Sequence, residues 1–196
     1  MTLKKPRKIL VIIQRSNGDV FLSLSLINIL YKHFNFPKID LLVNDDTISV
    51  AKIFPNINFI HKFSYKEKHE NRLNQEKEII SNIFRTYDLC INLTASDRRV
   101  FYCLLASKNS ISAIEKNDRK SWWQKLLLTS FYYFDNDKHI LYNNLESLNI
   151  LDISHKPFQE CPVLSDEIIQ KVKNKLNVLK ISKFVIFHPS AQYAYK

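Results

Sequence analysis

A short turn after the first apolar stretch of the sequence combines a carboxylate, a glycine and small polar side chains. Arg15-Ser-Asn-Gly-Asp19 directly follows the apolar run 8–14 and precedes apolar residues at helical spacing. A glycine in such a turn lets a ligand approach the backbone closely, and an aspartate at a helix start is able to accept a proton from a substrate hydroxyl group. The same spacing also fits an ordinary helix start, in which Asp19 caps the helix and Gly18 only forms the turn.

A second turn, near the end of the sequence, places a lysine after several small residues. His188-Pro-Ser-Ala-Gln-Tyr-Ala-Tyr-Lys196 follows the apolar run 183–188. A lysine at the far end of such a turn, together with backbone amides, is suited to neutralising a phosphate group. By itself this pattern favours an exposed terminal lysine over a phosphate contact.

The elements predicted around these two turns alternate between strands and helices. Apolar β-branched runs predict buried strands, and helical spacing of apolar residues predicts the helices between them. The polar segment 66–85 predicts a solvated helix or a loop. The order predicts an α/β fold, a Rossmann-like doubly wound parallel sheet with the first strand at its centre. The predicted strands are 8–14, 39–43, 57–63, 87–93 and 110–114, and the predicted helices are 19–34, 47–54, 96–107, 122–134 (as one helix or a pair) and 139–151.

A proline-containing segment separates two predicted domains. Residues 154–164 include Pro157 and Pro162 and predict a linker. We expect an N-terminal Rossmann-like domain over 1–153 and the beginning of a second Rossmann-like domain over 165–196. That second part has a predicted helix from Ser165 to about residue 179, a buried strand over 183–188 and a loop, which are too few elements to close a core.

The composition excludes several classes of protein. With 45% hydrophobic and 24% charged residues among 196, the chain is typical of a folded globular protein. A single glycine excludes G-x-G-x-x-G and Walker-type phosphate loops, because each needs at least two. Three cysteines without metal-ligand spacing predict neither a disulfide framework nor a zinc site, and we expect no metal. No apolar run approaches the roughly 18 residues that a membrane span requires.

The charge of the chain indicates an acidic partner. An excess of 29 Lys and Arg over 19 Asp and Glu gives a formal net charge of +10. Nucleic acid, an anionic membrane face and a phosphorylated or carboxylated small molecule all satisfy this charge. The aromatic residues are not interleaved with basic ones on one strand face, so we expect no nucleic-acid partner.

The two turns, in this order, resemble motifs of the ADP-heptose:lipopolysaccharide heptosyltransferase family of bacterial glycosyltransferases. Family members open with a strand followed by S-x-G-D, present here as Ser16-Asn-Gly-Asp19. Their middle carries a Y-D-x-x-I-D-L-Q-G-like segment, present as Tyr87-Asp-Leu-Cys-Ile-Asn-Leu-Thr-Ala95. Here Asn92 replaces the usual aspartate and Ala95 replaces the glycine.

The second turn resembles the start of the family's second domain. That domain begins with H-P-G-A and then K-R-W-P, and this chain has His188-Pro-Ser-Ala191 and reaches only the lysine, Lys196. Ser190 replaces the glycine. The resemblance therefore covers the whole chain as the first half of the family pattern.

The resemblance implies a GT-B architecture, in which two Rossmann-like domains face each other across a cleft. It implies inverting transfer of heptose from ADP-heptose to a lipid A acceptor that bears Kdo or heptose, as a step of lipopolysaccharide core synthesis. No cofactor or metal is implied beyond the donor substrate. The implied location is cytoplasmic and peripheral to the inner face of the bacterial inner membrane. We expect these 196 residues alone to be inactive, because most of the donor domain is missing from them.

The resemblance also implies roles for individual residues. Asp19 matches the base that deprotonates the acceptor hydroxyl, and Ser190, Ala191 and Lys196 match the turn that holds the donor diphosphate. Each cation also fits a merely solvated surface position. The candidate acceptor-binding residues are Ser16, Asn17, Gly18, Lys62, Lys66, Arg72, Arg98 and Arg119, with Lys68, Arg99 and Lys120 near them in the sequence.

A second hypothesis is a non-catalytic basic module, or a remnant, that binds an anionic membrane or a glycolipid. It predicts salt-sensitive binding and no role for Asp19.

Overall fold

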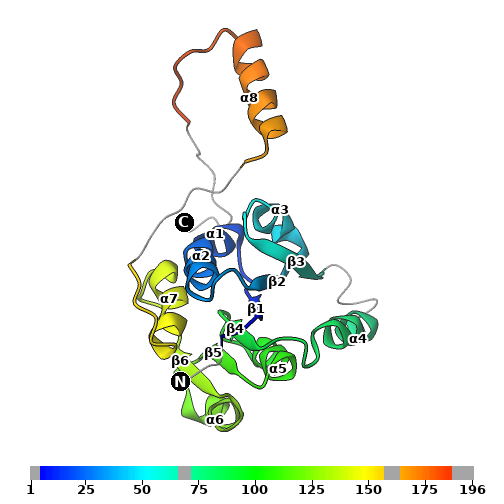
Figure 1. The fold of residues 1–196 in the computed structure, drawn as a ribbon, viewed down its shortest axis with the longest axis vertical. Coiled ribbons are helices and arrows are strands. Elements are labelled where there is room, and N and C mark those ends of the chain that lie inside the picture. Colours follow the sequence, from blue (N-terminus) through cyan, green and yellow to red (C-terminus); the bar gives the residue numbers. More distant parts are fainter. Residues whose placement is uncertain (1–4, 66–71, 157–163, 187–196) are drawn as a thin grey trace. The chain divides into compact units, whose positions relative to one another are not determined.

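The computed structural model describes residues 5–65, 72–156 and 164–186. Its centre is a sheet of parallel strands, which confirms the predicted α/β class (Figure 1). The strand order is β3-β2-β1-β4-β5-β6, the doubly wound order of a Rossmann-like domain. The strands are β1 (Lys8–Ile12), β2 (Lys38–Asn44), β3 (Ile57–Phe63), β4 (Leu89–Asn92), β5 (Ser110–Ile114) and β6 (Ser130–Tyr133).

Helices cover both faces of the sheet, as an alternating strand–helix order requires. One apolar cluster packs α1, α2, α3 and α7 against one face, and two others pack α4, α5 and α6 against the opposite face. The helices of this domain are α1 (Asn17–Leu22), α2 (Leu24–His33), α3 (Ile48–Ala51, preceded by the 3₁₀ turn η1, Asp45–Thr47), α4 (Arg72–Ile83), α5 (Asp97–Ala106), α6 (Asp118–Leu127) and α7 (Ile140–Ile150).

The first strand lies at the centre of the sheet, as predicted. Ile9 and Val11 face one apolar cluster, and Leu10 and Ile12 face the other, because successive side chains of a strand point to opposite faces. All four side chains are fully buried. A strand buried on both faces and paired on both edges holds the residues that follow it in a fixed position.

Two predicted helices differ from the structure. The prediction of one helix over 19–34 is wrong, because Ser23 separates α1 from α2, and its hydroxyl donates to the Val20 carbonyl at 2.7 Å. The prediction of helix over 122–134 is wrong at its second half, where β6 pairs with β5. Its residues Ser130–Tyr133 are aromatic-rich, which suits a strand once an edge is available for pairing.

The chain divides into two compact units, residues 1–162 and 163–196. In the second unit, α8 (Asp166–Val178) begins at Ser165, whose hydroxyl accepts a hydrogen bond from the Ile168 amide at 3.4 Å. The predicted strand over 183–188 is not formed in its described part, and Val185 is 94% exposed. A strand requires a partner strand, and the described residues of this unit offer none. Most of the predicted linker lies outside the described residues, so its bounds stay a prediction.

None of the helices in the described ranges combines the length and the hydropathy needed to cross a bilayer. The same residues contain no group of three His, Cys, Asp or Glu side chains placed to hold a metal ion.

Candidate active site

The candidate site lies at the carboxyl ends of β1 and β4. In the sheet, β1 lies between β2 and β4. The strands β2 and β3 extend the sheet on one side of β1, and β4, β5 and β6 extend it on the other, so the strand order reverses between β1 and β4. The segments after the two strands are joined by hydrogen bonds from the Gln14 amide to Thr94 Oγ1 at 3.2 Å and from the Leu93 amide to the Ile12 carbonyl at 2.9 Å. Open parallel sheets bind their ligands in the crevice at this point.

Asp19 lies in the first turn of α1 and is held by Arg15. The Arg15 Nε donates to Asp19 Oδ2 at 2.9 Å, and the guanidinium lies 4.8 Å from the centre of the Phe134 ring. The Asp19 side chain keeps 24% of its surface exposed, and Oδ1 has no hydrogen-bond partner among the described residues. The carboxylate is thus fixed in direction and still accessible from solvent.

The cap of α1 is Ser16 rather than Asp19. Ser16 has extended backbone angles, and its hydroxyl accepts from the Asp19 amide at 3.5 Å. The Asp19 carboxylate accepts its hydrogen bond from the Arg15 side chain and does not cap the helix.

Gly18 lies within α1 and has no positive φ angle, so the turn does not require a glycine. A Cβ built on Gly18 meets no atom within 4 Å. Open space therefore lies beside the backbone one residue before Asp19.

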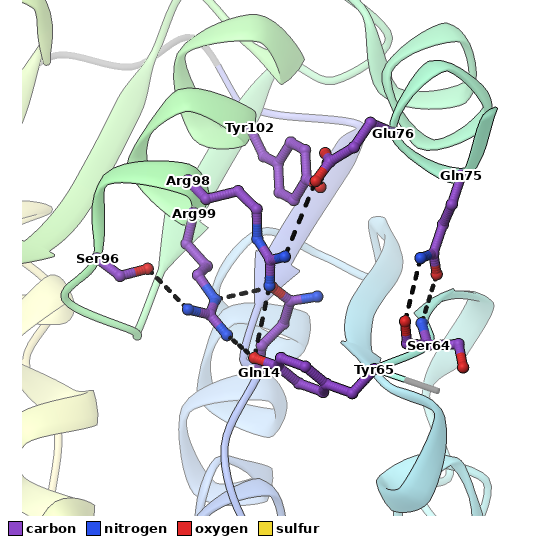
Figure 2. A network of polar contacts seen from close by, with 9 residues as sticks. All are labelled: Gln14, Ser64, Tyr65, Gln75, Glu76, Ser96, Arg98, Arg99 and Tyr102. Carbon is purple, nitrogen blue, oxygen red and sulfur yellow. Dashed lines mark hydrogen bonds and ion pairs between the residues drawn. The ribbon is translucent and has the colours of Figure 1, made fainter. Parts of the chain in front are cut away.

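A second part of the site is a pair of arginines at the start of α5 (Figure 2). Arg99 donates from Nε to Gln14 Oε1 at 2.8 Å and from Nη1 to Ser96 Oγ at 2.9 Å. Its Nη2 donates to the Tyr65 hydroxyl. Burial lowers the pKa of the Arg99 guanidinium, and Tyr65 partly offsets this effect. Arg99 thus ties together the ends of β1, β3 and β4.

The neighbouring Arg98 lies between aromatic rings and an acid. Its guanidinium carbon is 3.8 Å from the centre of the Phe63 ring, and Nη1 lies 3.8 Å from Glu76 Oε1. The Tyr102 hydroxyl donates to Glu76 Oε2 (Figure 2), and burial together with this contact raises the pKa of Tyr102. Arg98 keeps 20% of its side-chain surface exposed, so part of its charge faces solvent.

A depression opens beside Arg15, which forms part of its lining. It has a volume of about 370 Å³ and is formed by the segments that follow β1, β4, β5 and β6. Its lining residues are Arg15, Ala95, Glu115, Lys116, Asn117, Phe134 and Asn136. A larger depression of about 710 Å³ lies between residues 5–8 and 34–38, at the opposite ends of the strands. We place the site at the carboxyl ends, because the helix starts and the polar side chains converge there.

Asn92, one of the residues that depart from the family pattern, has a structural role of its own. Asn92 is fully buried and donates to the Thr94 carbonyl at 2.9 Å and to Ser112 Oγ at 2.8 Å. Its Oδ1 accepts from the Thr94 amide at 3.1 Å. An ionised aspartate has no donors to replace the first two bonds. Asn92 therefore shapes the turn that leads to Ser96 and the arginine pair.

The predicted site residues fall into three groups. Asp19, Ser16, Asn17 and Gly18 share the start of α1, and Arg98 lies beside Arg99 at the start of α5. The exposed residues Lys62 on β3, Arg72 on α4 and Arg119 on α6 form no hydrogen bond or ion pair with either of these groups among the described residues. Outside the described residues lie Lys66, Lys68, Ser190, Ala191 and Lys196.

Sequence reasoning missed Gln14, Tyr65 and Glu76. Gln14 is the first polar residue after an apolar strand, a signal that was available in the sequence. Tyr65 and Glu76 carried no local signal, because only the pairing of β3 and the packing of α4 on α5 bring them to Arg98 and Arg99.

The strand order and the crevice define a Rossmann-like α/β domain of the kind found in GT-B glycosyltransferases. A solved structure of a family 9 glycosyl transferase from Veillonella parvula matches 92% of this chain with a TM-score of 0.74 and 16% identity, over 51% of its own chain. The E. coli heptosyltransferase WaaC, solved with ADP-2-deoxy-2-fluoro heptose, matches 78% of this chain with a TM-score of 0.65 and 13% identity, over 50% of its own chain. At these identities the structures establish the fold.

In sequence, the chain is 28% identical over 193 residues to lipopolysaccharide heptosyltransferase 3 of Escherichia coli (strain K12). The match covers 93% of this chain and 54% of that protein, so the chain spans about half the length of this relative. No protein-family model matches the chain. The resemblance to the heptosyltransferase family, over part of the relatives' length, is confirmed. The comparisons do not favour the hypothesis of a non-catalytic basic module.

Proposed function

We propose that the protein is a heptosyltransferase of lipopolysaccharide core synthesis, and that the described domain binds the acceptor. The observation that carries this proposal is the Asp19 carboxylate, held by Arg15 at the start of α1 beside open space at Gly18. The similarity to heptosyltransferase 3 over 93% of the chain supports the choice of sugar.

In the proposed reaction, Asp19 Oδ1 accepts the proton of an acceptor hydroxyl group. The acceptor oxygen forms a bond to the anomeric carbon of the heptose while the bond from that carbon to the diphosphate oxygen breaks. ADP leaves with the electron pair, on the face opposite the attack, so the configuration inverts. Arg15 contributes by fixing the direction of the carboxylate through Oδ2, which leaves Oδ1 for the proton.

The donor is proposed to be ADP-heptose, in line with the relatives whose structures were solved with ADP or with an ADP-heptose analogue. The proposed diphosphate contacts are Ser190, Ala191 and Lys196, where a cation and backbone amides offset the charge of the leaving group. We propose that the reaction needs no cofactor or metal.

The acceptor is proposed to be a Kdo-bearing lipid A at the inner face of the bacterial inner membrane. Its phosphate and carboxylate groups suit arginine, whose planar fork binds both kinds of anion. Arg98 is the strongest candidate, because its neighbours orient it and part of it stays exposed. The other proposed acceptor contacts are Ser16, Asn17, Gly18, Lys62, Lys66, Arg72 and Arg119.

The proposal is tested by incubating the full-length protein with ADP-heptose and Kdo-bearing lipid A. We expect the mass of the acceptor to rise by one heptose, and NMR of the new linkage to show inverted configuration. Retained configuration, or transfer to a protein or a free sugar in place of lipid A, contradicts the proposal. We also expect the 196-residue chain alone to give no product, and a clear turnover by it contradicts that expectation.

A further inference from the structure

Helix α6 buries two uncharged polar side chains and exposes three large apolar ones, Trp122, Leu126 and Leu127. Ser121 and Gln124 are buried at 1% and 5% exposure, whereas Trp122 and Leu126 are 63% and 75% exposed. The usual surface helix shows the opposite arrangement. The outward apolar face therefore has no explanation in the packing of this domain.

The inward polar side chains are held by specific contacts. Gln124 Nε2 donates to Asp97 Oδ1 at 2.6 Å, and the Ser121 hydroxyl donates to the Asn117 carbonyl. Leu128, just after the helix, is buried against Val100 and Ile114. These contacts fix the rotation of α6 and keep its apolar face pointing outward.

The outward face extends onto the neighbouring helix. A groove of about 620 Å³ runs between α5 and α6, lined by apolar residues that include Phe101, Trp123 and Leu127. Phe101 and Leu127 are 49% and 59% exposed. We call Trp122, Leu126, Leu127 and Phe101 the α6 face. Figure 1 shows α6 at the end of the sheet, beside β5 and β6.

Cations border the α6 face. Both charged residues that line the groove are basic, Arg85 and Lys108, and both are exposed. Arg119 and Lys120 are exposed at the start of α6. Lysine is depleted from protein–protein interfaces, whereas anionic lipid headgroups attract it. Exposed Trp and Leu on a helix bordered by Lys and Arg are typical of a helix that lies in the membrane interface.

We propose that the α6 face docks the protein on an anionic lipid bilayer, with Trp122, Leu126 and Leu127 entering the interface and Arg119, Lys120, Arg85 and Lys108 meeting the headgroups. The inference rests on the proposed function only for the location of the acceptor in a membrane. It assigns that contact to the α6 face and the cations that border it.

The test uses flotation together with the fluorescence difference between the protein and its Trp122→Phe variant, because Trp122 is 63% exposed on α6 and this difference reports that side chain alone. The full-length protein is titrated with phosphatidylcholine vesicles that do or do not contain phosphatidylglycerol, without donor or acceptor. We expect the emission to shift to the blue, and the protein to float, with the anionic vesicles at low salt. No shift and no flotation with them overturns the proposal. So does a Trp122 contribution to the emission that is already blue without lipid, which indicates a protein segment or a second copy on this face.

Leu126→Ser is compared with Leu73→Ser, because the two leucines lie on helices and are 75% and 76% exposed. Loss of a leucine side chain from the interface is expected to weaken vesicle binding at least about tenfold, and Leu73→Ser is expected to leave it unchanged. Equal effects of the two changes overturn the proposal.

The charges are tested in the same way. Arg119→Gln with Lys120→Gln is expected to weaken anionic-vesicle binding about fivefold per cation, and Lys52→Gln with Lys77→Gln, on other exposed sites, is expected to have less effect. If the protein binds vesicles but does not transfer heptose, the proposed function is refuted and this inference stands. If the protein transfers heptose to a detergent-dispersed acceptor but does not bind vesicles, this inference is refuted and the proposed function stands.

Discussion

Gly18 is the only glycine of the sequence, and its backbone angles do not explain it. A glycine inside a helix is less favourable than alanine by about 1 kcal/mol. Helix stability therefore does not explain why a glycine is present in α1. The space beside it is empty and lies next to the Asp19 carboxylate. Under the proposed function, this space admits a close approach of the acceptor to the backbone.

Gly18→Ala therefore separates stability from function. We expect the melting temperature to stay the same or to rise, because alanine favours the helix and its Cβ meets no neighbour. We expect KM for the acceptor to rise in the full-length enzyme. Unchanged kinetics would contradict the assignment of the space at Gly18 to the acceptor.

Asn92 shows how a single amide fixes the geometry of the site. Asn92→Asp removes two donors from a fully buried position, and we expect the free energy of unfolding to fall by about 1–3 kcal/mol. Asn82→Asp, at an exposed position of α4, serves as the control. Chemical denaturation measures both, and equal stability of the two variants would contradict the role given to Asn92.

At the scale of elements, the strands were predicted well because a parallel sheet buries both faces of each strand. The runs 39–43, 57–63 and 110–114 stand out as apolar for this reason, and they agree with β2, β3 and β5 within two residues. Residues 130–133 were predicted as helix, because their aromatic side chains fit both structures and pairing with β5 decides between them. The apolar run at 183–186 formed no strand, since pairing partners and not apolarity alone make a strand.

The candidate site was predictable only where it is local. The turn from Arg15 to Asp19 is contiguous in sequence and was found, and Arg98 was found as a cation near a strand end. Tyr65 and Glu76 reach the arginine pair through contacts that span 22 to 34 residues. No periodicity or motif in one sequence reports such contacts.

A buried polar cluster links β2, β3 and the segment that enters β4. The Tyr87 hydroxyl donates to Asp40 Oδ2 at 2.8 Å, so the His61 Nε2 that lies 2.8 Å from this hydroxyl must be its donor. Burial lowers the pKa of the His61 imidazole below 6.5, against the opposing effect of Asp40. In the folded protein His61 is therefore more readily neutral than in the unfolded chain.

This shift predicts a dependence of stability on pH. Below pH 6.5 the unfolded chain binds a proton that the folded protein resists, so stability falls as the pH falls from 6.5 to the lowered folded pKa. We expect the free energy of unfolding of the protein to drop between about pH 7.5 and about pH 5.5, and that of His61→Gln to drop less. Parallel pH profiles of the two proteins would contradict the assignment to His61.

At the scale of the whole molecule, the two proposals concern two different surfaces. The crevice at the ends of β1 and β4 gathers Asp19, Arg15 and the arginine pair, and the α6 face presents tryptophan and leucine between cations. A net charge of +10 suits both a phosphorylated acceptor and an anionic bilayer. The chain spans about half the length of its relatives.

The most direct test of the central claim is the rate of heptose transfer by the full-length protein with Asp19→Asn, measured beside Asp46→Asn. Asp46 is an exposed carboxylate after β2, on the same edge of the sheet. The account predicts that Asp19→Asn lowers kcat by about 10²–10⁴-fold with little change in KM for the acceptor or in melting temperature, and that Asp46→Asn retains activity. Transfer by Asp19→Asn at the rate of Asp46→Asn would contradict the assignment of Asp19 as the base.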